Sequence, residues 1–85
     1  MSYSLSFEPE SITDLDNLTQ AVRGRILNKI EWLRSNFEQI SPLPLTANWS
    51  GFYKLRVGDY RVIYEFDVEL QVIIIIRVGH RSEIY

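Results

Sequence analysis

The first hydrophobic pattern in the chain has a period of two. Tyr3, Leu5 and Phe7 are separated by serines, which is the spacing of a strand with one buried face. From residue 9 the spacing changes to steps of three and four, which is typical of amphipathic helices. The pattern therefore predicts a first strand followed by helical structure.

The helical spacing divides into two segments. Pro9 suits the first turn of the first helix, in which Asp14 and Asp16 face outward from a stripe formed by Ile12, Leu15 and Leu18. Thr19 is a good N-cap for the second helix, whose stripe comprises Val22, Ile26, Ile30, Leu33 and Phe37. Two amphipathic helices of this kind can cover one face of a sheet.

The second half of the chain is rich in β-branched and aromatic residues. The stretch ISPLPLTANWSG, with two prolines and a Ser-Gly pair, is predicted to be a loop. Three strands follow, FYKLRV, YRVIYEF and QVIIIIRV, and the last is apolar on both faces, which favours a central position. The prediction is an α+β fold of order β-α-α-β-β-β, an antiparallel sheet with a two-helix hairpin packed on one face.

A two-residue turn at Gly58-Asp59 determines the register of the first two of these strands. Arg56 then opposes Arg61, and Lys54 points to the same side as Arg56. The other side carries the apolar residues that face the helices, namely Tyr53, Leu55, Val57, Tyr60, Val62 and Tyr64. Three cations therefore gather on the face that the helices leave open. Like charges opposed across a ladder are destabilising unless an anion, a carboxylate or water offsets them.

The composition is that of one small folded domain, which we expect to span residues 1–85. Hydrophobic residues make up 46% of the chain and charged residues 24%, unlike a disordered protein. Cysteine is absent and histidine occurs once, which argues against disulfides and a structural zinc site; we expect no metal or cofactor. No secretion signal or membrane-spanning run is recognisable, so we expect a cytoplasmic protein.

The net charge of −2 is unevenly distributed. Residues 1–49 hold four basic and six acidic residues, whereas residues 50–85 hold five of each. Overall steering toward a polyanion is therefore weak, and nucleic-acid binding has to come from the local cluster. The alternative interpretation is a solvated sheet face whose cations pair with Glu65, Asp67 or Glu69.

The segment RVGHRSEIY adds candidate chemistry after the last strand, with Arg77, His80, Arg81 and Tyr85. A lone histidine near a strand end is more often exposed or packed than a general acid or base. A last residue such as Tyr85 often frays. Next to a cationic sheet face, these residues nevertheless complete a candidate site.

The segments GFYKLRVGDYRVIYEF and IIIIRVGHRSEIY resemble the RelE/ParE superfamily of toxins, specifically its RelE branch, and the resemblance covers nearly the whole chain. It implies a fold similar to that of microbial ribonucleases and cleavage of messenger RNA in the ribosomal A site. Lys54 and Arg56 fall at the family's basic strand positions, and His80 stands where some members have lysine. The positions of the arginine after the hairpin, the tail arginine and the C-terminal tyrosine are taken by Arg61, Arg81 and Tyr85.

RNA can be cleaved without a metal when its own 2′-hydroxyl attacks the neighbouring phosphate. This step needs a base, cations for the charge that develops on the phosphate, and an acid for the departing 5′-oxygen. Our hypothesis assigns the phosphate clamp to Arg61 and Arg81, because a planar guanidinium matches phosphate oxygens. Lys54 is the base or an electrostatic anchor. Tyr85 stacks on a base or donates the proton, and His80 competes for the acid role.

The resemblance also implies partners, namely a RelB-like antitoxin, the ribosome with its mRNA, and operator DNA for the toxin–antitoxin complex. Two other functions on the same scaffold stay open. One is a ParE-like gyrase inhibitor without nuclease chemistry, and the other is a degenerate member that binds only its antitoxin and operator. The presence of Lys54, Arg61, Arg81 and Tyr85 favours the nuclease.

Overall fold

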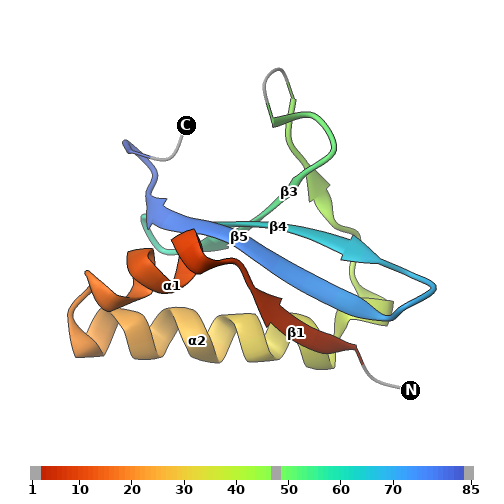
Figure 1. The fold of residues 1–85 in the computed structure, drawn as a ribbon, viewed down its shortest axis with the longest axis horizontal. Helices are drawn as coiled ribbons and strands as arrows, with labels where there is room; N and C mark the ends of the chain where they lie inside the picture. Colours follow the sequence, from red (N-terminus) through yellow and green to blue (C-terminus); the bar gives the residue numbers. More distant parts are fainter. Residues whose placement is uncertain (1–2, 47–48, 84–85) are drawn as a thin grey trace.

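The strands form one five-stranded sheet, with α1 and α2 on the same face of it (Figure 1). The computed structural model describes residues 3–46 and 49–83. Its elements are β1 (Ser4–Phe7), α1 (Pro9–Asp16), α2 (Gln20–Ser35), the 3-10 turn η1 (Phe37–Gln39), β2 (Leu43–Pro44), β3 (Tyr53–Val57), β4 (Tyr60–Asp67) and β5 (Val72–His80). The strand order is β1-β5-β4-β3-β2, which places β5 between two neighbours, as its two apolar faces suggested. The α+β fold predicted from the sequence is confirmed.

Two features at the edges of the sheet were not predicted. β1 runs parallel to β5, with Ser4 opposite Val72, whereas the other neighbouring strands are antiparallel. The short strand β2 lies in the stretch predicted as loop and pairs Leu43 with Lys54. Both features depend on pairing between separate segments rather than on the pattern within one segment.

Local chemistry determines where the helices begin. Pro9 occupies the first turn of α1, where a backbone N–H has no helical partner in any case. Thr19 caps α2 as predicted, because its Oγ1 accepts a hydrogen bond from the Val22 N–H at 3.3 Å. Within the described ranges, no helix has the length and apolar character needed to cross a lipid bilayer.

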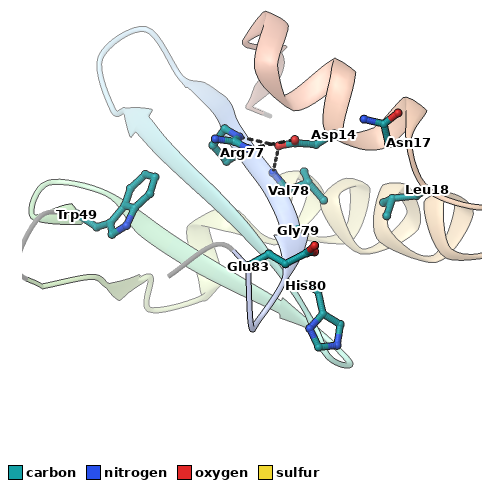
Figure 2. Close-up of a pocket in the computed structure, with 9 residues that line it drawn as sticks. All are labelled: Asp14, Asn17, Leu18, Trp49, Arg77, Val78, Gly79, His80 and Glu83. Atoms are coloured by element: carbon teal, nitrogen blue, oxygen red, sulfur yellow. Dashed lines mark hydrogen bonds and ion pairs between the residues drawn. The ribbon is translucent and has the colours of Figure 1, made fainter.

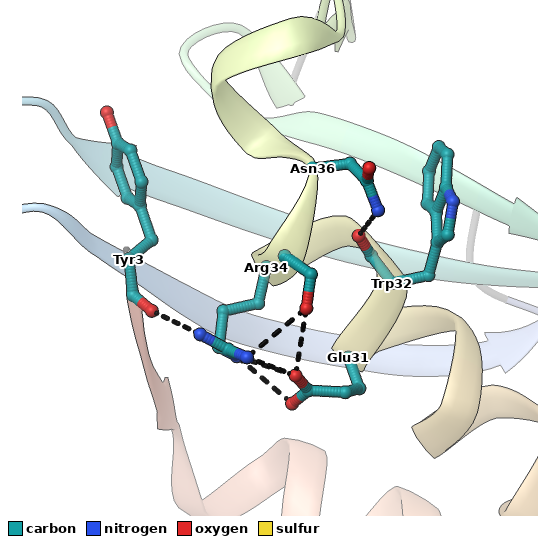
Figure 3. Close-up of polar contacts among 6 residues, drawn as sticks. Tyr3, Glu31, Trp32, Arg34 and Asn36 are labelled. Carbon is teal, nitrogen blue, oxygen red and sulfur yellow. Dashed lines mark hydrogen bonds and ion pairs between the residues drawn. The ribbon is translucent and has the colours of Figure 1, made fainter. Parts of the chain in front are cut away.

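α2 ends before its apolar stripe does. The helix stops at Ser35, and the Asn36 side-chain amide donates to the Trp32 carbonyl oxygen at 2.9 Å, which satisfies one carbonyl of the last turn (Figure 3). Phe37 therefore lies in η1 rather than in the predicted helix. It is still buried, with its ring centroid 4.8 Å from that of Tyr3.

The last turn of α2 is also tied to the beginning of the described chain. Arg34 pairs with Glu31 one turn earlier and donates through Nη1 to the Tyr3 carbonyl oxygen at 3.1 Å (Figure 3). One guanidinium therefore links the helix to the segment that enters β1.

The turn between β3 and β4 confirms the predicted register. Val57 pairs with Tyr60 across the turn, and Arg56 pairs with Arg61. Of the two central residues only Gly58 has a positive φ, of 60°. This is the pattern of a type II′ hairpin turn, which favours glycine at the first central position.

The face of the sheet toward the helices forms the hydrophobic core. α2 contributes Ile26, Ile30 and Leu33, each at most 1% exposed. They belong to one cluster with residues of β3, β4 and β5, namely Leu55, Val57, Val62, Tyr64, Ile73, Ile75 and Val78. The apolar positions predicted for this side of the hairpin are all buried or packed against the cluster, so the predicted assignment of the two faces is confirmed.

A β-bulge turns Arg77 away from this core. Two consecutive residues of β4 pair with Arg77 and Ile75, so Ile76 is an additional residue in β5. Because of it, Ile75 and Val78 both enter the core although they are three positions apart. Strict alternation would have placed Arg77 on the same side as Ile75.

α1 covers the part of the β5 edge that β1 leaves open. β1 pairs with residues 72–75, and beyond them the Val78 N–H donates to Asp14 Oδ2 at 2.9 Å. The same carboxylate accepts from Arg77, through Nε at 2.8 Å and Nη2 at 3.2 Å. The expectation that Asp14 faces outward was therefore wrong. Its carboxylate takes the place of a missing strand partner.

Replacing Asp14 by alanine should lower the free energy of unfolding by about 1–3 kcal/mol, because the part-buried Val78 N–H loses its acceptor. Asp14→Asn retains an acceptor oxygen and should lose less. Urea unfolding followed by circular dichroism measures both. Asp16→Ala is the matched control, since that carboxylate is largely exposed and lies 3.9 Å from Arg23. An Asp14→Ala variant as stable as this control would contradict the role at the sheet edge.

Stability should also fall in alkaline solution because of Tyr64. Burial, with a smaller contribution from neighbouring Tyr53, raises the pKa of Tyr64 from 10.0 to about 12. Between these values the unfolded chain loses the proton while the folded chain keeps it, so stability that is present below pH 10 is lost as the pH rises toward 12. At pH 11 the loss from this group should be about 1 kcal/mol. Urea unfolding at pH 7 and pH 11 should show this additional loss in the parent but not in Tyr64→Phe.

Candidate functional site

The open face of the sheet carries the three predicted cations. Arg56 and Arg61 are directly paired across β3 and β4, and Lys54 pairs with Ile63. Residues opposed across a ladder, or two apart on one strand, point to the same side. That side is the one away from the helices, because the intervening Leu55 lies in the core. Lys54, Arg56 and Arg61 therefore form one group, which we call the cationic strip.

Arg61 is the member of the strip with a buried donor that lacks a partner among the described residues. Its Nη1 donates to the Tyr60 carbonyl oxygen at 3.3 Å, whereas its buried Nε has no hydrogen-bond partner among the described residues. The residue opposite on β5 is Gly79, so no side chain from that position covers the guanidinium. A buried charged donor without an acceptor is unfavourable, and a bound anion would relieve it.

The segment after β5 returns to the β3–β4 turn. The Arg81 N–H donates to the Asp59 carbonyl oxygen at 2.8 Å, and the Arg81 side chain is exposed. This bond ties the backbone of Arg81 to a residue two positions from Arg61. The structure thus brings the Arg61 and Arg81 segments together, as the sequence hypothesis requires.

The arginines of this region lack the carboxylate partners that the alternative interpretation gave them. Within the described part of the chain, Arg56, Arg61 and Arg81 form no ion pair with any carboxylate. This includes the carboxylates that the alternative interpretation proposed, namely Glu65, Asp67 and Glu69. The ion pairs that the structure shows involve other arginines, namely Arg23, Arg34 and Arg77. The positive charge of the three arginines is therefore not offset by an ion pair with any described residue.

His80 lies on the other side of the sheet from Arg61. It pairs with Tyr60, and the two rings contact each other edge-on with centroids 5.5 Å apart. Its Nδ1 lies 2.8 Å from Ser82 Oγ and accepts from the Ser82 N–H at 3.2 Å. The imidazole is thus held by Tyr60 and its own turn rather than brought into the cationic strip. Tyr85, the other candidate acid, lies outside the described residues.

Arg77, which the sequence analysis named without a role in the reaction, reaches the open face. It opposes Ile63 across the ladder, on the same side as Lys54. The hydrogen bonds that Arg77 donates to the Asp14 carboxylate hold the pKa of Arg77 above its ordinary value. Because this charge is already paired, Arg77 contributes less to anion binding than Arg61 does.

A hollow of about 430 Å³ lies beside the strip, along the exposed end of β5 (Figure 2). Arg77, Gly79, His80 and Glu83 line it from β5 and the following turn, and Trp49 lines it from the loop before β3. Sequence reasoning missed Trp49, although a tryptophan within the polar stretch TANWSG is a visible signal. Among the described residues, no group of three or more acidic or histidine side chains is placed to hold a metal ion.

The comparison with protein families gives a match to the model described as ParE toxin of type II toxin-antitoxin system, parDE, over residues 5–85. Among curated proteins, Toxin RelG of Mycobacterium tuberculosis is 29% identical over 89 residues, which cover 100% of this chain and 98% of that protein.

Solved structures give the same result. The toxin–antitoxin complex RelBE2 from M. tuberculosis contains a chain with a TM-score of 0.84 at 25% identity, covering 98% of this chain and 95% of that one. The archaeal RelE-RelB complex from Pyrococcus horikoshii matches with a TM-score of 0.75 at 26% identity, covering 98% and 99% of the two chains. A mutant of the E. coli toxin RelE in the free state has a TM-score of 0.75 at 26% identity over 96% and 86%. With a family match over almost its full length and the sheet, helices and hairpin described above, the chain belongs to the RelE/ParE superfamily of type II toxin–antitoxin toxins.

Proposed function

We propose that the chain is a ribosome-dependent endoribonuclease that cleaves messenger RNA and so inhibits translation. The observation that supports this most strongly is the cationic strip, in which the buried Arg61 Nε has no hydrogen-bond partner among the described residues. Such a group is suited to a phosphodiester, because guanidinium donors match phosphate oxygens in pairs. The similarity to RelG and RelE toxins over nearly the entire chain supports the same assignment.

In the proposed reaction the 2′-hydroxyl of the substrate attacks the adjacent phosphate. The O–P bond to the 2′-oxygen forms, the bond to the 5′-oxygen breaks, and the products carry a 2′,3′-cyclic phosphate and a 5′-hydroxyl. Arg61 and Arg81 bind the phosphate oxygens and stabilise the charge that develops on them. Lys54 accepts the 2′-hydroxyl proton or acts as an electrostatic anchor, and Arg56 adds positive charge next to it.

The proton for the departing 5′-oxygen is assigned to Tyr85. His80, the competing candidate, has its ring on the helix side of the sheet next to Tyr60, so it would have to leave the contacts with Tyr60 and Ser82 to reach a phosphate at Arg61. This placement favours Tyr85. No metal is required by the scheme, because the cations of the protein perform the charge stabilisation.

The proposed partners are a RelB-like antitoxin, the ribosome and its mRNA. The M. tuberculosis and P. horikoshii structures similar to this chain are toxin–antitoxin complexes, which supports an antitoxin partner here. With these partners, the protein is proposed to act in the cytoplasm. Its complex with the antitoxin is proposed to bind operator DNA. We infer that residues 1–85 form a single toxin domain.

A second function, inhibition of DNA gyrase, is favoured by the ParE description of the matching family model. Two assays on the toxin freed from its antitoxin separate the candidates. Primer extension on translated messages detects cleavage, and a supercoiling assay detects gyrase inhibition. Supercoiling inhibition without any cut in translated messages would replace the nuclease proposal with the gyrase one.

Arg61→Ala and Arg81→Ala should each lower the rate of ribosome-dependent cleavage by about 100-fold or more, because each removes a donor to the developing phosphate charge. Their far-ultraviolet circular dichroism should match that of the parent. Arg23→Ala is the matched control, since it removes an arginine of α2 whose nearest carboxylate is Asp16 at 3.9 Å. Full cleavage by either test variant, or an equal loss in the control, would eliminate the phosphate clamp.

A further inference from the structure

The hollow beside the cationic strip has an aromatic wall. Trp49 lines it and is only partly exposed, and its indole contacts Phe52 edge-on at 5.7 Å. Two backbone hydrogen bonds hold this turn, from the Trp49 N–H to the Thr46 carbonyl oxygen at 3.1 Å and from the Phe52 N–H to the Trp49 carbonyl oxygen at 3.0 Å. The tryptophan is therefore positioned by local structure on the open face of the sheet.

The charges in the hollow differ from those of the strip. Arg77 is paired with Asp14, so its charge is compensated. The Glu83 carboxylate has no hydrogen bond or ion pair with any described residue, and in Figure 2 its oxygens lie beside Gly79. A second phosphate would meet this carboxylate unfavourably. The hollow is suited instead to an uncharged, flat group that can donate a hydrogen bond.

The hollow and the strip meet at one residue of β5. Gly79 lines the hollow and pairs with Arg61 across the ladder. A phosphate bound at Arg61 would thus place the attached nucleotide next to the hollow, whose volume of about 430 Å³ is in the range of small-molecule sites. The substrate unit that is flat, uncharged and adjacent to a phosphate is a nucleobase.

We propose that this hollow is a nucleobase site, in which a base next to the scissile phosphate stacks on Trp49 and donates an amino hydrogen to Glu83. The inference rests on the proposed function in one respect, that the substrate is RNA. Stacking on an aromatic side chain is a common means of holding unpaired bases. A carboxylate accepts hydrogen bonds only, so it favours bases with an exocyclic amino group, namely adenine, cytosine and guanine. Uracil is disfavoured because its N3–H lies between two carbonyl oxygens that repel a carboxylate.

The two tryptophans of the chain provide a direct binding test. Trp32 lies on α2, 42% exposed and with the Lys29 ammonium 4.0 Å from its ring centroid, and it is not part of the hollow. Trp32→Phe leaves Trp49 as the only fluorophore of this type, and Trp49→Phe leaves Trp32. Short 2′-O-methyl oligoadenylate, which cannot be cleaved by 2′-hydroxyl attack, should quench the first variant saturably and leave the second unchanged. Equal quenching, or quenching of neither, would overturn the inference.

Base preference tests the role of Glu83. Oligoadenylate should bind the Trp32→Phe protein about tenfold or more tightly than oligouridylate does, and adding Glu83→Gln should reduce this ratio, because a glutamine amide can also donate to uracil carbonyl oxygens. Glu38→Gln, at an exposed site in η1, is the control and should leave the ratio unchanged. An unaltered ratio in Glu83→Gln removes Glu83 from the site.

Cleavage on the ribosome separates this inference from the proposed function. If the parent cleaves messages, Trp49→Ala should slow cleavage about tenfold or more while Trp32→Ala does not, and equal rates overturn the nucleobase site. If the parent does not cleave, the proposed function fails. The quenching experiment then still decides the inference, because it requires no chemistry.

Discussion

The register of the β3–β4 hairpin is the constraint on which both the core and the candidate site depend. The turn at Gly58 pairs Arg56 with Arg61, which brings two like charges together on one face. A shift by one residue would move these guanidinium groups into the core and expose Leu55, an outcome that costs several kcal/mol because a buried charge would be left unpaired. Burial of the apolar side chains on one face of the hairpin therefore keeps Arg56 and Arg61 close together on the other face, despite their repulsion. The hydrophobic core therefore determines the register that keeps Arg56 and Arg61 together on the open face.

In β5, a bulge and an ion pair allow apolar residues to face the core while a charged residue faces outward. Its sequence has to supply Ile75 and Val78 to the core while directing Arg77 outward, and the additional residue Ile76 makes this possible. Asp14 then compensates the charge of Arg77 and satisfies the edge N–H of Val78. As a result, the cation nearest the hollow is neutralised, whereas Arg61 across the ladder from Gly79 is not. The division between a charged strip and a less basic hollow follows from this difference.

Features determined within a short segment could be predicted from the sequence. The cap at Thr19, the turn at Gly58 and the alternation through Leu55 each depend on neighbours within a few residues, and all three were confirmed. The parallel pairing of β1 and the bonds of Asp14 join segments about 60 to 70 residues apart, and the bulge at Ile76 depends on how β5 pairs with β4. A periodic pattern contains no information on such pairs, which is why Asp14 was assigned to the outer surface.

The same reasoning applies to the candidate site. The shared face of Lys54, Arg56 and Arg61 was predictable because one hairpin determines it. The position of His80 was not, since its side depends on pairing with Tyr60 after the bulge has changed the alternation of β5. Trp49 enters the hollow only because the loop before β3 folds over the sheet, which no local pattern indicates. Pairing between strands and loops thus explains both why His80 lies outside the cationic strip and why Trp49 was missed.

The acidic net charge is compatible with this site because charges are sorted by location. Arg23, Arg34 and Arg77 pair with carboxylates, so three of the nine basic side chains are compensated within the fold. Arg56, Arg61 and Arg81 form no such pairs within the described residues, and their field is local. A molecule with a net charge of −2 has little long-range attraction for RNA, and a local field acts only over about a Debye length of 8 Å in the cell. An enzyme with this distribution benefits from a larger assembly that delivers the RNA strand to it, which is the physical argument for ribosome dependence in the proposed reaction.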